Sequence, residues 1–160
     1  MQLLFWYNRR MATTLHDPQL TAWRLFLHVH ATCIDRIDSE LTAAQRIPLH
    51  WYDVLIELAE APEQRLRMHE LARSVVLSRS GLTRLVDRLE AAGYLCRQPD
   101  PQDRRGSFAV LTEAGHTAVR HAWPVYAQGI EHTFAQHVTD AEAATLTDVF
   151  ERMLMTARPK

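Results

Sequence analysis

A long helical pattern dominates the first quarter of the chain. Apolar and aromatic side chains recur there at alternating spacings of three and four residues, which places them on one stripe of a single helix. The members of this stripe are Leu20, Trp23, Leu27, His30, Ile34, Ile37 and Leu41. A helix of about six turns is long for a small domain, and its stripe resembles the seam of a coiled coil. We expect Pro48 to end this region.

Shorter elements follow in the middle of the chain. We predict a helix over roughly residues 50–61, a short extended link over 65–68 and a short helix over 69–76. A further helix over 78–92 has Ser78 as its N-cap and Gly93 just beyond its C-terminus. Its buried stripe consists of Leu82, Leu85, Val86 and Leu89.

The opposite face of the helix over 78–92 is polar and rich in arginine. It carries Arg79, Ser80, Thr83, Arg84, Asp87 and Arg88. Such a face is ordinarily just solvated, but Ser, Thr and Arg at the start of a helix also suit base edges and phosphates. The face alone leaves both interpretations open.

A β-hairpin is predicted directly after this helix. Residues 94–98 and 106–111 can pair as strands, and the turn-rich segment 99–105 between them contains Arg104 and Arg105. A polar helix followed by an arginine-tipped hairpin is the layout of a winged helix-turn-helix. The helix fits the major groove of DNA, and the slim hairpin can enter the minor groove.

The C-terminal third predicts association with a second chain. Thr112 caps a helix that we expect to run to about Val138 with a bend at Pro124, and residues 139–142 form a capping box for a final helix. The apolar face of the final helix consists of Leu146, Val149, Phe150, Met153 and Leu154. The apolar faces of this helix and of the first helix together offer more surface than a small winged domain needs for its core. The alternative is an intramolecular bundle.

Charge is unevenly distributed along the 160 residues. The whole chain has a net charge of −1, which excludes a uniformly basic nucleic-acid coat protein. Residues 65–105, however, hold nine arginines and five acidic residues, or +4, and the remainder therefore carries −5. We divide the chain into an arm over 1–17, a helical dimerisation region over 18–48 and 112–160, and a winged domain over 49–111.

Several short motifs resemble those of the MarR family of bacterial transcription regulators. They are Leu71-Ala72, the helix over 78–93 ending in Leu89-Glu90-Ala91-Ala92-Gly93-Tyr94-Leu95, the wing sequence over 100–105 and Leu111-Thr112-Glu113-Ala114-Gly115. The wing pattern D-x-R, here Asp103 and Arg105, is the most specific part. The resemblance covers roughly residues 20–157. It implies a mainly α winged helix-turn-helix protein with long N- and C-terminal dimerisation helices.

The family resemblance also implies a function and a set of DNA-contacting residues. A cytoplasmic homodimer would bind a pseudo-palindromic operator in double-stranded DNA and act as a repressor. Arg105 would reach the minor groove, Asp103 would orient it, and Arg104 would meet phosphate. The other expected DNA-binding residues are Arg79, Ser80, Gly81, Thr83, Arg84, Arg88 and Arg97. The family often has a Ser or Thr cap before the helix over 69–76, where this chain has Arg67 and Met68.

The resemblance further implies release by a small aromatic or phenolic acid. Candidate effector-binding residues are Trp23, Phe26, His30, His50, Trp51 and Asp53, because aromatic walls with a few polar groups suit such a ligand. Each also has a plain structural interpretation as a core, interface or helix-terminus residue.

Other classes of function have weaker support in the sequence. Cys33 or Cys96 could make this a thiol-responsive regulator and the nine histidines a metal-responsive one, but neither set has a convincing spacing, and we expect no metal and no cofactor. No nucleophile elbow, phosphate-binding loop or zinc-protease motif indicates an enzyme. A non-DNA-binding helical interaction protein would leave the wing arginines unexplained. We expect no membrane segment, and Met1 or Met11 could be the true start.

Overall fold

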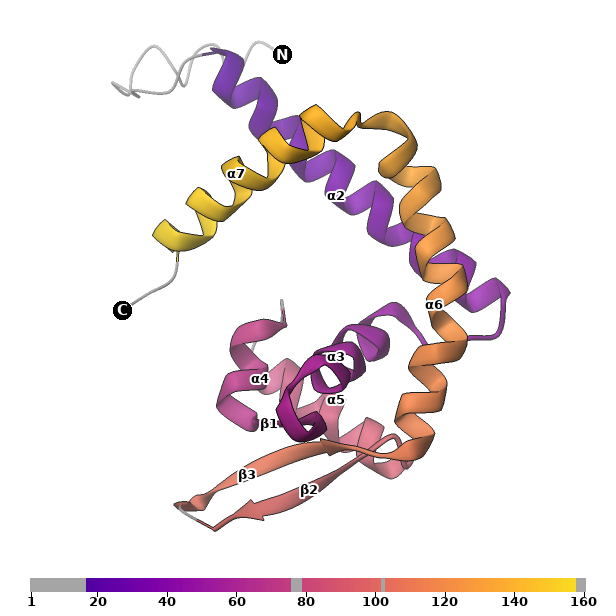
Figure 1. The fold of residues 1–160 in the computed structure, drawn as a ribbon, viewed down its shortest axis with the longest axis vertical. Coiled ribbons are helices and arrows are strands. Elements are labelled where there is room, and N and C mark those ends of the chain that lie inside the picture. The colour runs from indigo at the N-terminus through magenta and orange to yellow at the C-terminus, as the bar shows by residue number, and fades with distance from the viewer. Residues whose placement is uncertain (1–16, 76–78, 102, 158–160) are drawn as a thin grey trace.

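The computed structural model describes residues 17–75, 79–101 and 103–157, without the side chains of Arg79, Ser80, Arg104, Arg105 and Ala157. It is mainly helical, with a small antiparallel sheet at one end (Figure 1). Three long helices, α2, α6 and α7, form a frame, and the shorter helices and the sheet form a separate lobe below it (Figure 1). This arrangement confirms the predicted winged helix-turn-helix fold class.

Helix α2, Asp17–Ala43, is the single long helix that the stripe predicts. Only the C-terminal third of that stripe is buried, at Ile37 and Leu41, where α6 packs alongside (Figure 1). Gly129 of α6 allows this close approach, because a Cβ there would lie 2.8 Å from Cγ1 of Ile37. The stripe from Trp23 to Ile34 remains exposed, including Trp23 at 52%, and Leu20 is half-buried.

The core of the lobe lies between three helices and the sheet. Helices α3 (Leu49–Glu60), α4 (Met68–Ser74) and α5 (Arg79–Ala91) each bury an apolar face. The largest fully buried side chains are Tyr52, Leu41, Leu55, Leu58, Leu71, Leu82, Leu85, Leu89 and Leu95. Burying leucine side chains at about 1.5–3 kcal/mol each provides most of the force that closes this lobe. All four residues of the predicted α5 stripe are buried, as expected.

The C-terminus of α5 has the backbone geometry that its sequence predicts. Gly93 has φ of +78°, its N–H donates to the Glu90 carbonyl, and the Tyr94 N–H donates to the Leu89 carbonyl. These two bonds make a Schellman motif, which turns the chain sharply from helix into wing. The predicted N-cap, Ser78, lies outside the described residues.

The sheet has three strands in the order β1-β3-β2, namely β1 (Arg65–Arg67), β2 (Leu95–Asp100) and β3 (Asp103–Leu111). The link expected over 65–68 is therefore partly a strand, and the tip expected over 99–105 is much shorter. Pro99 indicated a turn, but it pairs with Ser107 in β2. A proline is tolerated there because β2 is an edge strand and needs no outward N–H bond.

The C-terminal helices begin as predicted but break earlier. Thr112 accepts a hydrogen bond from the Gly115 N–H at 3.1 Å and caps α6, which spans Glu113–Thr133 and contains Pro124. The helix expected to reach Val138 ends at Thr133, and a short 3-10 turn, η2 (Ala135–His137), follows. The expected capping box forms where the Thr139 N–H donates to Glu142 at 2.9 Å. It starts α7, Asp140–Ala157.

Helix α7 packs only loosely on its own chain. None of its described residues is buried, and Leu154 and Met155 are 59% and 76% exposed. Its contact with α2 includes the rings of Phe150 and Phe26, whose centroids lie 5.8 Å apart. The frame therefore leaves a broad apolar surface uncovered. No helix in the described ranges is long and apolar enough to cross a membrane.

Candidate nucleic-acid interface and neighbouring cavities

Helix α5 presents its polar face because its apolar face is fixed in the core. With Leu82, Leu85, Val86 and Leu89 buried, the side chains of Thr83, Arg84 and Arg88 are turned outward and exposed. Gly81 is half-buried in the first turn. Arg79 and Ser80 open the helix, and their side chains lie outside the described set.

His50 lies beside this face, which the sequence did not indicate. A groove of about 600 Å³ is lined by His50 of α3 and by Gly81, Arg84, Leu85, Asp87 and Arg88 of α5. Burial lowers the pKa of His50, Asp38 acts in the opposite direction, and Arg88 lowers it further. The groove therefore combines two guanidinium groups with an imidazole that tends to be neutral.

Arg97 of β2 joins the wing to α5. Its guanidinium contacts Asp87 Oδ1 at 2.5 Å and also Glu90, and its backbone N–H donates to Glu90 at 2.8 Å. The expected DNA contact of Arg97 stays a prediction. In this structure its side chain is engaged by two carboxylates of the helix.

The distal end of β2, near the tip of the wing, holds a second ion pair. Arg67 Nε lies 2.8 Å from Asp100 Oδ2, and Asp100 is only 5% exposed. Arg67 thus anchors the hairpin to β1. Its backbone N–H donates to the Glu70 carboxylate at 2.9 Å, and Arg67 itself stands at the cap position where the family often has Ser or Thr. The guanidinium groups of Arg65 and Arg67 also lie 4.8 and 5.4 Å from the ring centroid of Phe108.

The tip of the wing carries the D-x-R pattern. Gly106 eases the packing here, because a Cβ would lie 3.1 Å from Asp103 Oδ2 and 3.3 Å from the Asp100 Cβ, which is tighter than most Cβ contacts. Asp103 is exposed, and Arg104 and Arg105 follow it in β3 with side chains outside the described set. Figure 1 shows the hairpin projecting away from the helices, as a groove-entering wing must.

The six expected effector-binding residues do not form one pocket within this chain. Trp23, Phe26 and His30 lie on the exposed half of α2, with ring centroids 5.9 and 6.4 Å apart. Trp51 packs edge-on against Tyr94, at 5.8 Å between centroids, as part of the core. Two of the six, His50 and Asp53, line a shared cavity.

That cavity, of about 320 Å³, lies between α3, the end of α4 and α6. Its lining is His50, Asp53, Ile56, Glu57, Ser74, Val75 and Tyr126. Burial of the carboxyl group, with added repulsion from Glu57 and Asp38, raises the pKa of Asp53 to about 6. Burial, with the Asp53 charge in addition, also raises the pKa of Tyr126, so its hydroxyl stays protonated at neutral pH.

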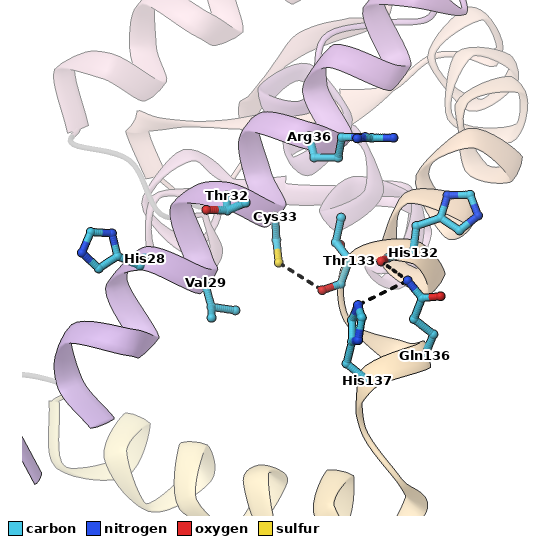
Figure 2. Close-up of a pocket in the computed structure, with 9 residues that line it drawn as sticks. All are labelled: His28, Val29, Thr32, Cys33, Arg36, His132, Thr133, Gln136 and His137. Atoms are coloured by element: carbon cyan, nitrogen blue, oxygen red, sulfur yellow. Dashed lines mark hydrogen bonds between the residues drawn. The ribbon is translucent and has the colours of Figure 1, made fainter. Parts of the chain in front are cut away.

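A second cavity, of about 590 Å³, lies between α2 and the end of α6 (Figure 2). Figure 2 shows the Cys33 thiol directed at the Thr133 carbonyl, 3.6 Å away, with His132 and His137 on the far wall. His28 and His30, two residues apart on α2, do not both line it. In the described ranges, no group of three His, Cys, Asp or Glu side chains could hold a metal ion.

Comparisons with known proteins agree with this geometry. A model of the MarR family matches residues 47–106, the span from the loop before α3 to the wing. BadR, a transcriptional activatory protein of Rhodopseudomonas palustris, is 30% identical over 108 residues, 66% of this chain and 59% of BadR. The transcriptional repressor MprA of Escherichia coli is 27% identical over 130 residues, 81% of this chain and 70% of MprA. The chain thus spans about six-tenths of BadR.

Solved structures extend the similarity to nearly the whole chain. Sco3205, a MarR family regulator from Streptomyces coelicolor solved in complex with DNA, is 29% identical with a TM-score of 0.84. The alignment covers 92% of this chain and 93% of Sco3205. AbsC from the same organism is 27% identical with a TM-score of 0.83, covering 92% and 99%. These relatives are transcriptional regulators and not enzymes, in agreement with the prediction.

Proposed function

The chain belongs to the MarR family of transcriptional regulators, and from this premise we propose that it binds an operator in double-stranded DNA as a homodimer. The observation that carries the proposal is the exposed Arg84–Arg88 face of α5 beside the projecting wing, in a fold that Sco3205 shares in its complex with DNA. No enzymatic activity is proposed.

The proposed DNA contacts divide into three kinds. Arg79, Ser80, Gly81, Thr83, Arg84 and Arg88 belong to α5, which would enter the major groove and read base edges. Arg105, oriented by Asp103, would enter the minor groove, where negative potential is enhanced, and Arg104 would meet phosphate. Arg97 would position the wing relative to α5, because its guanidinium is engaged by Asp87 and Glu90.

The exposed apolar surface of the frame supports a homodimer. Helices α2, α6 and α7 leave large side chains uncovered, namely Trp23, Leu25, Phe26, Leu27, Val29, Ile34, Trp123, Phe134, Phe150, Met153, Leu154 and Met155. A soluble monomer rarely leaves this many large apolar side chains exposed on neighbouring helices. A second copy would bury it with twofold symmetry. Two α5 helices would then meet half-sites about 34 Å, or roughly 10 bp, apart.

We propose repression as the regulatory outcome. The relatives include both the activatory protein BadR and the repressor MprA, so the family alone does not set the direction. Repression requires only that the bound dimer cover a promoter, whereas activation requires a further contact with the transcription machinery. A reporter gene placed behind the operator should therefore increase in expression when this protein is deleted.

The Arg105→Ala substitution tests the DNA-binding proposal. We expect the affinity for a duplex selected by the wild-type protein from a random-sequence pool to fall at least tenfold, with thermal unfolding unchanged. Wild-type affinity should also decrease steeply with salt, because each phosphate contact releases counterions. A gel-shift titration at several salt concentrations measures both effects.

Arg120→Ala provides the matched control, since it removes an exposed arginine from α6, outside the recognition helix and the wing. It should leave the affinity unchanged. An equal midpoint for Arg105→Ala and the wild type would refute the wing assignment. A helical interaction protein without DNA affinity would show no selected duplex at all.

A further inference from the structure

The cavity between α3 and α6 has an acidic lining that does not suit an aromatic acid. Asp53 and Glu57 are separated by one helical turn and therefore lie on the same side of α3, and both line the cavity. Asp38 adds a third negative charge close enough to affect Asp53. No ion pair joins Asp53 or Glu57 to a cation in the part of the chain that the structure describes.

Apolar and aromatic groups complete the wall. Ile56 of α3, Val75 after α4 and the ring of Tyr126 of α6 also line the space. The Tyr126 ring is held in place by Tyr52, whose centroid lies 4.6 Å away and which is itself 1% exposed. The volume of about 320 Å³ is at the lower end of the range for ligand cavities. It admits a single aromatic ring with a short side chain.

We propose that this cavity binds a small arylalkyl ammonium ion. Its positive charge would lie against Asp53 and Glu57, and its ring against Tyr126, Ile56 and Val75. An aromatic carboxylate of the same size would bring a fourth negative charge to the three already present, and the repulsion between like charges disfavours its binding. The expectation of a phenolic acid from the family resemblance is thereby replaced, at this cavity, by a ligand of opposite charge.

His50 connects this cavity to the DNA-facing groove. The same side chain lines the cavity with Asp53 and the groove with Arg84 and Arg88 of α5. Because the imidazole already tends to be neutral, a ligand bound against Asp53 would act on it by contact, and would change the shape of the groove beside Arg84 and Arg88. This regulatory consequence rests on the proposed function, whereas ligand binding itself can be measured without DNA.

Three probes with the same phenol ring test the charge requirement. They are tyramine, which carries an ammonium group, 4-ethylphenol, which is neutral, and 4-hydroxyphenylacetate, which carries a carboxylate. Isothermal titration of the full-length protein at pH 7.5 should show tyramine binding at least tenfold more tightly than either of the others. Asp53→Asn and Glu57→Gln should each weaken tyramine at least tenfold.

Glu60→Gln is the matched control, because Glu60 lies on α3 and is exposed but does not line the cavity. It should leave the titration unchanged, and circular dichroism should show all three variants folded. The proposal is overturned if no probe binds, if the carboxylate binds as tightly as tyramine, or if Asp53→Asn and Glu57→Gln retain wild-type affinity. Tyramine binding without any DNA affinity of the free protein would instead overturn the proposed function alone.

Discussion

Two glycines, one on each side of the wing, are needed for different physical reasons. Gly115 in the first turn of α6 is buried, and a Cβ there would lie 2.1 Å from the Tyr94 carbonyl oxygen and 2.7 Å from Leu111 Cδ1. Gly93 has no atom within 4 Å of its missing Cβ but has φ of +78°. One glycine is required by crowding and the other by backbone conformation.

These two glycines give a paired prediction. Gly93→Ala should cost about 1 kcal/mol, because an alanine must adopt the left-handed conformation. Gly115→Ala should cost about 3 kcal/mol, because the clash is with backbone, which cannot move without displacing α6. Urea unfolding at one fixed protein concentration measures both values. Equal costs for the two substitutions would contradict the packing of α6 on Tyr94.

At the scale of elements, the orientation of the wing relative to α5 depends on a small electrostatic clamp. Arg97 of β2 bridges Asp87 and Glu90, which lie one turn apart on α5, and Thr112 donates to the Gly93 carbonyl at 2.7 Å from the other side of the hairpin. These contacts join the C-terminal end of α5 to β2 on one side and to the N-cap of α6 on the other. The sequence predicts Arg97 as a DNA contact, because no spacing along the chain shows that Asp87 and Glu90 both face it.

The Arg97→Gln substitution distinguishes a positioning residue from a phosphate contact. If Arg97 positions the wing, the affinity for the selected duplex should fall about threefold to tenfold with the salt dependence unchanged. A direct phosphate contact would reduce the slope of log affinity against log salt by about 1. Gel-shift titrations across a salt series, with Arg84→Gln as a comparison at an exposed α5 position, separate the two roles.

At the scale of the whole molecule, charge and apolar surface are separated between two regions. The segment over 65–105 that forms most of the winged lobe carries +4, and the remainder carries −5. The large exposed apolar side chains of the described residues lie on the frame helices α2, α6 and α7 and at Phe134, outside the lobe that carries the wing. The net positive charge is thus confined to the lobe proposed to bind DNA, and the uncovered apolar surface lies on the frame proposed to form the dimer.

The Leu154→Asp substitution tests whether the apolar surface of the frame forms the dimer interface. A buried charge in the proposed interface should convert a dimer to a monomer, and the affinity for a two-half-site duplex should fall by at least a hundredfold because each lobe then binds alone. Glu151→Gln, an exposed change on the same helix, should leave the dimer intact. Sedimentation velocity measures the assembly, and a monomeric wild-type protein would instead support an intramolecular arrangement of the frame.

Much of the fold was predictable from local patterns. The long α2, the buried stripe of α5, the Gly93 terminus, the Thr112 cap and the capping box at Thr139 all appear where expected. Each depends on residues within a few positions of one another. The sequence-based prediction differed from the structure at β1, at the wing tip and at the end of α6. These features depend on residues far away in the chain; for example, β1 forms because Leu66 pairs with Ala109.

The sequence by itself determined the winged helix-turn-helix class, the resemblance to the MarR family and the arginine-rich face of α5, because periodicity, caps and short motifs are local properties of the chain. Only the tertiary structure decided which polar groups meet. It engaged Arg97 with Asp87 and Glu90, set His50 beside Arg84 and Arg88, and placed Asp53 and Glu57 on the wall of one cavity. The physical reason is that electrostatic interactions depend on distances across packed elements, and no spacing along the sequence specifies those distances.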